Sequence, residues 1–215
     1  TLVNREVLNY PMIATGIAIG AVIGAIMART IKMTAMPQMV AIFNGVGGGA
    51  SALIAISEFA RVTEGDLSLI KQHEEIAIML GTLIGLVTLT GSLVAFGKLQ
   101  GIVTSNAVSS PIIKTLNPVL FLGIVGMIVY LVILAEGSSV FLVLIAVSLI
   151  LGILLVMPIG GADMPVVVSL LNSYSGLAAS AAGFVLGNPL LVLAGALVGA
   201  AGLILTRLMC RAMNR

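Results

Sequence analysis

Residues 138–158 read SSVFLVLIAVSLILGILLVMP, a stretch without a charged side chain. Its apolar residues follow one another continuously and lack the alternation that a strand of a membrane barrel would show. About 20 consecutive apolar residues are enough for a helix to cross the hydrocarbon core of a membrane. The stretch therefore predicts a transmembrane helix and defines the pattern to look for along the rest of the chain.

The composition indicates that most of the chain shares this character. Of its 215 residues, 60% are hydrophobic and 8% are charged, and the mean hydropathy is +1.23, whereas soluble domains carry about 25% charged residues. A net charge of +2 is too small to build a nucleic-acid-binding face, so we expect no nucleic-acid partner. We predict one transmembrane domain over residues 1–215, surrounded by lipid and without a built-in soluble catalytic domain.

The charged residues mark the ends of the spans, because an ionised side chain near the bilayer centre costs about 2.5 to 3.5 kcal/mol. The apolar runs between the ten Lys and Arg and the eight Asp and Glu residues predict an all-α, polytopic bundle with about seven spans. The predicted spans lie near residues 10–28, 36–57, 76–96, 117–135, 138–158, 164–186 and 189–209. The first is too long and too weakly basic at its front to be a signal peptide.

The charges in the linkers predict an orientation. One side of the membrane receives Asp163 and the basic residues Arg29, Lys32, Lys98, Lys114, Arg207, Arg211 and Arg215. The other side receives Arg5, Arg61 and Lys71 together with Glu6, Glu58, Glu64, Asp66, Glu74, Glu75 and Glu136. Basic residues concentrate on the cytoplasmic side of membrane proteins. We therefore expect the N-terminus outside and the C-terminus in the cytoplasm.

Small residues recur at helical spacing in several spans, which favours close helix packing. They are Gly16, Gly20, Gly24 and Ala28 in the first span, and the pairs Gly81 and Gly85, Gly183 and Gly187, and Gly195 and Gly199. The cluster Gly45 to Ala50 matches the letters of a dinucleotide fingerprint. That motif needs a strand before it and a helix start after it, so we reject this interpretation in the middle of an apolar run.

Polar residues within the spans are the candidates for chemistry. Ser169, Asn172, Ser173, Tyr174 and Ser175 cluster near mid-membrane depth, where each polar group needs a partner. For the serines, hydrogen bonding between helices is the favoured interpretation. For Asn172, structural bonding and a role in holding water are equally supported, because an amide both donates and accepts without carrying a charge.

Three further residues complete the candidate set from the residues alone. Asn44 lies one turn before the glycine cluster and must face the bundle interior. His73 is the single histidine, and its ordinary pKa of about 6.5 lets it load and release a proton near neutrality, although an ordinary surface role is favoured for a linker histidine. Glu58, at the outer end of its span, is a second entrance group. No cysteine, histidine and carboxylate grouping has metal-ligand spacing.

Four blocks of sequence resemble one family. They are MPQMVAIFNGVGGG at 36–49, TGSLVAFGKLQG at 90–101, GGADMPVVVSLLNSYSG at 160–176 and CRAMNR at 210–215. In these blocks the chain looks like the membrane domain of the beta subunit of the proton-translocating NAD(P) transhydrogenase.

The resemblance implies part of an oxidoreductase and translocase in the bacterial inner membrane, which moves hydride between NAD(H) and NADP(H) while protons cross. It implies an alpha subunit with the NAD(H) domain, an NADP(H)-binding domain expected after residue 215, and a homodimer of the complete enzyme. We expect one or two family helices before residue 1. This chain would hold the proton path and bind no nucleotide by itself.

The resemblance also assigns roles by motif. Asn172 corresponds to an asparagine associated with proton conduction, and Asp163 to an acid that communicates with the NADP(H) domain. His73 falls near the family's channel histidine, about one residue out of register. Gly202 follows Ala200 and Ala201 where some relatives carry hydroxyl residues. We place Asn172, His73, Asn44, Glu58 and Ser173 in the proton path, and Asp163, Gly202 and Arg211 in the coupling to the soluble domains.

Two other classes of function remain open from the residues. An ion or solute transporter subunit unrelated to redox chemistry would also use a mid-membrane asparagine beside glycines. A membrane anchor would need no polar path at all and would tolerate loss of the Asn172 amide.

Overall fold

The computed structural model describes residues 10–63, 72–134 and 138–214. Within them the α-helices are α1 (Tyr10–Thr30), α2 (Met36–Thr63), α3 (Gln72–Leu99), α4 (Pro111–Leu134), α5 (Ser138–Val156), α6 (Met164–Val185) and α7 (Pro189–Ala212). The 3-10 turns η2 (Met33–Ala35) and η4 (Gly161–Asp163) precede α2 and α6. All seven α-helices are long and apolar enough to cross a membrane, which confirms the predicted all-α transmembrane fold.

The chain divides into two compact units, Thr1–Met36 and Pro37–Arg215. In the first unit, Gly16, Gly20 and Gly24 follow one another at one-turn spacing on the same face of α1. The hydroxyls of Thr15 and Thr30 donate back to carbonyls of their own helix. Helix α1 therefore satisfies these polar groups internally, as a helix in lipid must.

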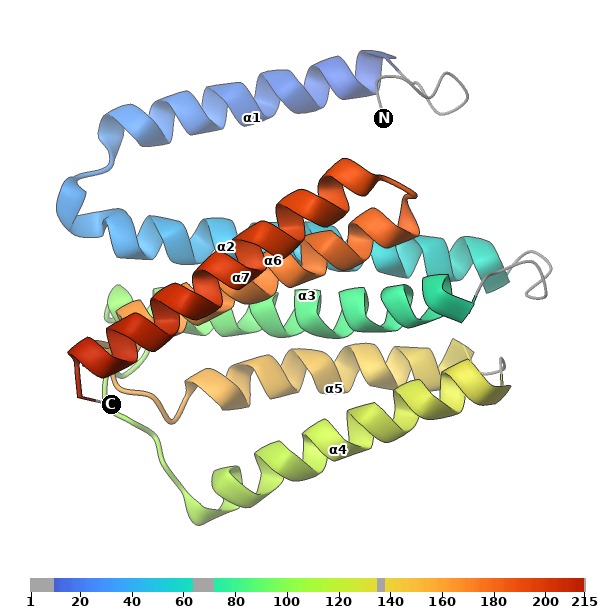
Figure 1. Ribbon diagram of the computed structural model, residues 1–215. Helices are drawn as coiled ribbons and strands as arrows, with labels where there is room; N and C mark the ends of the chain where they lie inside the picture. Colours follow the sequence, from blue (N-terminus) through green and yellow to red (C-terminus); the bar gives the residue numbers. More distant parts are fainter. Residues whose placement is uncertain (1–9, 64–71, 135–137, 215) are drawn as a thin grey trace. The chain divides into compact units, whose positions relative to one another are not determined.

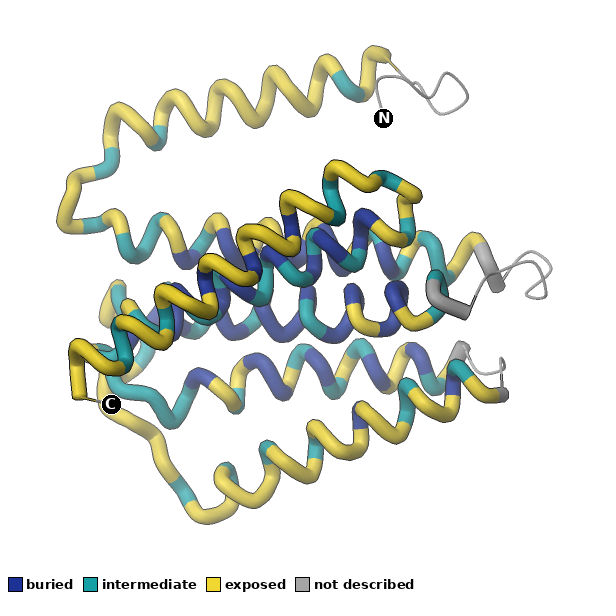
Figure 2. Tube along the Cα trace, viewed as in Figure 1, coloured by how far each residue is buried: buried dark blue, intermediate teal, exposed yellow. Residues whose placement is uncertain are grey.

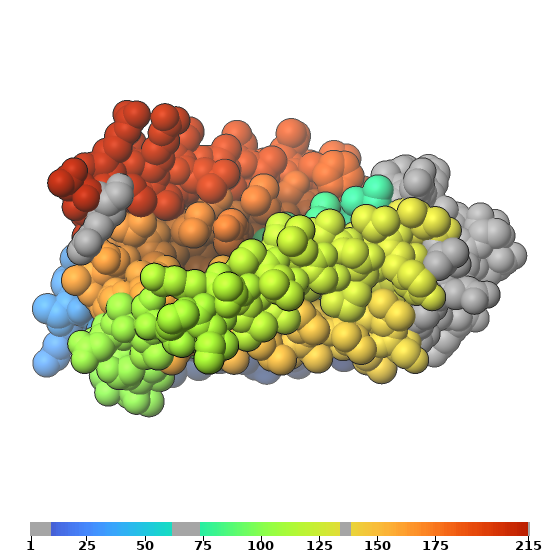
Figure 3. Space-filling view, turned by 90° about the horizontal axis from the view of Figure 1, so that it is seen from below, coloured from blue at the N-terminus to red at the C-terminus, as the bar shows by residue number. Residues whose placement is uncertain are grey.

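In the second unit, α3 and α6 form the centre (Figure 1). Helix α3 packs against α5 and α6, and α6 packs against α7. Burial reflects this arrangement, because 67% of the span of the central helix α3 is buried, whereas only 11% of the α4 span is buried (Figure 2). Helix α4 lies over α5 on one outer face (Figure 3). The central helices are thus the ones whose polar groups must find partners within the bundle.

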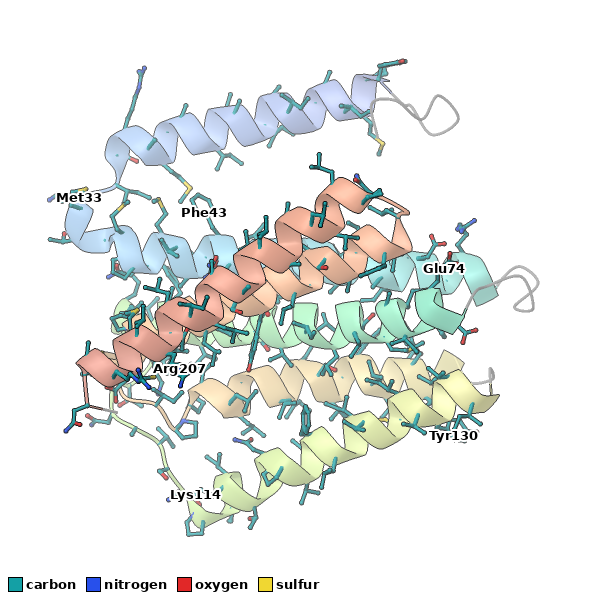
Figure 4. The ribbon with its side chains drawn as sticks, viewed as in Figure 1. Met33, Phe43, Glu74, Lys114, Tyr130 and Arg207 are labelled. Atoms are coloured by element: carbon teal, nitrogen blue, oxygen red, sulfur yellow. The ribbon has the colours of Figure 1, made fainter. Side chains whose placement is uncertain are left out.

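Consecutive helices of this unit run in opposite directions, so their ends gather at two levels. We call the level at which α3 ends the Lys98 end, and the level of the α6–α7 turn the Asn188 end. Lys114 and Arg207 lie at the Lys98 end and Glu74 at the Asn188 end (Figure 4). The starts of α2 and α6 and the end of α7 share the Lys98 end.

The glycine cluster of α2 is a helix-packing surface. The helix runs without interruption through it. A Cβ built on Gly48 would lie 2.8 Å from the Thr88 Cβ, and one on Gly85 would lie 2.5 Å from the Gly48 carbonyl oxygen. Since no strand or turn opens a helix here, the geometry supports rejecting the dinucleotide fingerprint.

Helices α6 and α7 form a tight hairpin through glycines. A Cβ on Gly176 would lie 2.5 Å from the Gly199 nitrogen, so the two backbones touch. Gly187 was expected to continue the small-residue row of α6 but lies in the turn after it, with φ +59°. Asn188 then caps α7 by accepting from the Leu191 N–H at 3.2 Å.

Several helices extend beyond the apolar runs that predict them. Helices α2 and α3 each have 28 residues, or about 42 Å, which exceeds a hydrocarbon core of about 30 Å. Helix α4 begins at Pro111, before Lys114, instead of near Asn117. Charges end an apolar run, but they do not end a helix whose tip can project into the polar interface.

Candidate functional site

Asn44 joins α2 to α6 at two points. Its side chain is buried, with 7% exposed, and its Nδ2 donates to the Val168 carbonyl at 3.1 Å. Its main-chain carbonyl accepts a hydrogen bond from the Ser175 hydroxyl at 2.9 Å. Val168 and Ser175 lie one turn before and one turn after Asn172, so Asn44 faces the stretch of α6 that carries this second amide.

Asn172 lies on the seam between two packed faces of α6. At about 100° per residue, Val168 and Ser175 fall on one side of it and Ser169 and Ser173 on the other. The first pair contains the contacts to α2, and the second pair the contacts to α7. The Asn172 side chain is half-buried and forms no hydrogen bond with any described residue.

Ser169 and Ser173 of α6 bind α7. Ser173 is fully buried and donates to the Gly199 carbonyl at 2.5 Å. Ser169 donates to the Gly202 carbonyl at 3.4 Å and accepts from the Thr206 hydroxyl at 3.0 Å. These bonds match the structural role favoured for the serines from the sequence. Thr206 was missed there, and a lone hydroxyl in an apolar run was its only signal.

Gly202 packs directly against Ser173. A Cβ at Gly202 would lie 2.8 Å from the Ser173 Cβ and 2.9 Å from its Cα. This contact sits about 15 Å from the end of α7 at Ala212, counted at 1.5 Å per residue. The structure thus brings Gly202 together with the candidate proton-path residues, at a different depth from Asp163 and Arg211.

Asn44, Asn172 and the contact between Gly202 and Ser173 lie at about the same depth in the bundle. Asn44 is eight residues into α2 and Asn172 is eight residues into α6, or about 12 Å from helix starts at the same end of the bundle. In a hydrocarbon core of about 30 Å this depth is close to the middle. The opposite face of α6 is apolar, where Tyr174 and Leu177 line a cavity of about 210 Å³.

A buried hydroxyl on α3 also went unnoticed in the sequence. Ser92 is fully buried, and its Oγ has no hydrogen-bond partner within the described part of the chain. It faces α2, since a Cβ on Gly45 would lie 3.1 Å from the Ser92 Cβ. In the sequence it is one of many small residues, and only the register between helices places it next to the Asn44 turn.

The candidate entrance residues lie at the Asn188 end. Glu58 forms an ion pair with Arg61 one turn later, and Glu74 on α3 adds a weaker electrostatic attraction to the same guanidinium. His73 belongs to the first turn of α3, but its side chain lies outside the described residues. Glu58 and Glu74 therefore both lie within electrostatic reach of Arg61 at this end.

The remaining coupling candidates occupy the Lys98 end. Asp163 closes η4 and directly precedes α6, and its side chain is half-buried. Arg211 is exposed in the last turn of α7. No group of three or more potential metal ligands occurs in the described ranges.

Comparison with known proteins identifies the family. A family model described as "NAD(P) transhydrogenase beta subunit" matches residues 1–215. The chain belongs to this family. Two relatives named NAD(P) transhydrogenase subunit beta, one from Rhodospirillum rubrum and one from a named strain of that species, are each 44% identical over 218 residues. The alignment covers 100% of this chain and 47% of each relative, so this beta-subunit chain spans about half their length.

Proposed function

We propose that this chain is the proton-translocating membrane domain of an NAD(P) transhydrogenase. It couples proton movement across the membrane to hydride transfer between NAD(H) and NADP(H) in soluble domains. The family assignment over the whole chain supports the enzyme class. The observation that most supports the proposed proton path is the pair of amides at mid-depth, Asn44 and Asn172. Most of the other described polar side chains in the bundle donate hydrogen bonds to carbonyls.

The path follows from the chemistry of these groups. A bare proton cannot sit in hydrocarbon, so it must move along waters held by polar side chains. Asn172 has its donors and acceptor free to hold such a water. Glu58 and His73 take up the proton at the Asn188 end, because a carboxylate and an imidazole can each bind and release one. Asp163 passes the state of the path to the NADP(H) domain at the other end.

The complete enzyme supplies the partners and the nucleotides. We propose that an alpha subunit and an NADP(H)-binding domain assemble with this chain, that the complete enzyme is a homodimer, and that it resides in the bacterial inner membrane. The hydride-transfer site lies in the soluble domains. The role of Asp163, Arg211 and Gly202 is then to couple those domains to the path.

Replacement of Asn172 by leucine tests the proposal. In vesicles that contain the complete enzyme, we expect Asn172→Leu to abolish nucleotide-driven proton pumping, measured with an internal pH dye, and to slow coupled hydride transfer. Hydride exchange between the isolated soluble domains should not change.

Asn117→Leu is the matched control, because it removes an amide that donates to the Leu154 carbonyl at 3.2 Å between α4 and α5, away from the path. The control should still pump. Full pumping by Asn172→Leu would contradict the proposed path, and ion or solute flux without nucleotides would favour the transporter class.

A further inference from the structure

Lys98 is a buried cation that the proton path does not use. It occupies the last turn of α3, and only 1% of it is exposed. Its Nζ donates to the Met157 carbonyl at 2.6 Å and to the Ile159 carbonyl at 2.8 Å, with the Asn106 carbonyl at 3.5 Å. The sequence suggests an ordinary linker charge here, but the structure places the ammonium among main-chain carbonyls.

These acceptors come from two different linkers. Met157 and Ile159 belong to the α5–α6 linker, and Asn106 belongs to the α3–α4 linker. The two linkers also bond directly, because the Gly161 N–H donates to the Ser105 carbonyl at 2.8 Å and the Val108 N–H to the Met157 carbonyl at 3.2 Å. The Ser105 hydroxyl donates back to the Lys98 carbonyl at 3.1 Å. Lys98 is therefore the centre of the junction.

An ammonium suits this junction better than any other side chain. It carries three N–H donors on one atom, which matches the number of carbonyls around the Lys98 Nζ. Arginine presents a planar fork that fits a different arrangement. Methionine fills a similar length but removes the ammonium that donates to the Met157 and Ile159 carbonyls, and only the Met157 carbonyl keeps another donor, the Val108 N–H. Beside the junction lies a cavity of about 490 Å³, lined in part by Lys98, Ser105 and Gly161.

The α5–α6 linker leads directly into the functional helix. It continues through η4 to Asp163 and then into α6, which carries Asn172 and Ser173. We propose that Lys98 is a positioning residue that clamps the two linkers together and so fixes Asp163 and the start of α6. This role rests on the proposed function for its effect on coupling, whereas the clamp itself is a property of the fold.

Disulfide trapping tests the clamp without reference to activity. A Cβ on Gly161 would lie 3.1 Å from the Ser105 Cβ, close to the spacing of about 3.5 to 4.5 Å in disulfides. We would place Ser105→Cys and Gly161→Cys in the complete enzyme in membranes, with Cys210→Ser as background. Lys98→Met should slow disulfide formation at least about tenfold, because the carbonyls lose their shared donor.

Lys114→Met is the matched control, since Lys114 is an exposed lysine at the same end and should leave the trapping rate unchanged. An unchanged rate in Lys98→Met would overturn the clamp. If Lys98→Met does not accumulate in membranes, Lys98→Arg takes its place with the same readout, because it keeps the charge and changes the geometry.

Rescue by the disulfide tests the positioning role. Lys98→Met should lower coupled transhydrogenation and proton pumping together. Oxidation of the thiol pair introduced by Ser105→Cys and Gly161→Cys should restore both, and reduction should remove the rescue. Failure of the closed disulfide to restore coupling would overturn the positioning role and point to the charge itself. The rate of disulfide formation tests the clamp independently of the proton path. It would therefore remain informative if the Asn172→Leu result contradicted that path.

Discussion

Asn172 differs from Asn44 and Ser173 because its side chain forms no hydrogen bond with the described residues. Asn44 donates to α6 and Ser173 donates to α7, so each contributes to helix association. The Asn172 amide has no such bond among the described residues, and packing alone gives no reason for an amide at this position. A neutral amide in the membrane costs less than a charge and still orders water.

This difference predicts that replacing Asn44 and Asn172 by the same residue, leucine, affects stability and pumping differently. Asn44→Leu removes the bond to the Val168 carbonyl and should lower the free energy of unfolding by about 0.6 kcal/mol and at most about 1.7 kcal/mol, the average and the maximum for such bonds between membrane helices. Asn172→Leu removes no bond and should leave stability unchanged or higher while it abolishes pumping. Thermal unfolding of the two variants in the same detergent gives the comparison. A destabilised Asn172→Leu would return Asn172 to the structural role.

At the level of helices, the sequence predicts the elements well and their contacts poorly. Runs of apolar residues mark all seven helices because burial in lipid and burial in the bundle favour the same residues. The pairing of Asn44 with the Asn172 turn depends on the register between α2 and α6, which no local pattern encodes. The sequence places Lys98 among the linker charges, and only the fold reveals the carbonyls that surround its ammonium.

The α6–α7 contact yields a prediction at this level. Gly202→Ala places a methyl group 2.8 Å from the Ser173 Cβ, so the helices must separate and the Ser173 bond to Gly199 must lengthen. We expect a loss of about 1 to 3 kcal/mol in stability, as for other overpacked contacts, together with weaker coupling between hydride transfer and pumping.

Gly126→Ala on α4 provides the control for that substitution. A Cβ there meets no atom of the described chain within 4 Å, and alanine favours a helix over glycine by about 1 kcal/mol. Gly126→Ala should therefore be neutral or stabilising, with unchanged coupling. If both alanine variants behaved alike in chemical unfolding and in pumping, close approach at Gly202 would have no special role.

For the whole molecule, charge divides the second unit into two unlike ends. Among the described residues, the Lys98 end carries Lys98, Lys114, Arg207 and Arg211 with Asp163, and the Asn188 end carries Arg61 with Glu58, Glu74 and Glu75. The basic excess survives even when the buried Lys98 is left out. Basic residues are retained in the cytoplasm during insertion, so the Lys98 end should be cytoplasmic.

Single cysteines at the two ends test this orientation. In a Cys210→Ser background, Leu186→Cys after α6 should react with a membrane-impermeant maleimide in intact cells, because the Asn188 end faces outward. Ser109→Cys in the α3–α4 linker should react only after permeabilisation. Both residues are exposed in the structure. The reverse labelling would place Asp163 outside the cell, away from the proposed nucleotide-binding domains. It would therefore contradict both the orientation and the coupling role, but it would not affect the description of helix packing.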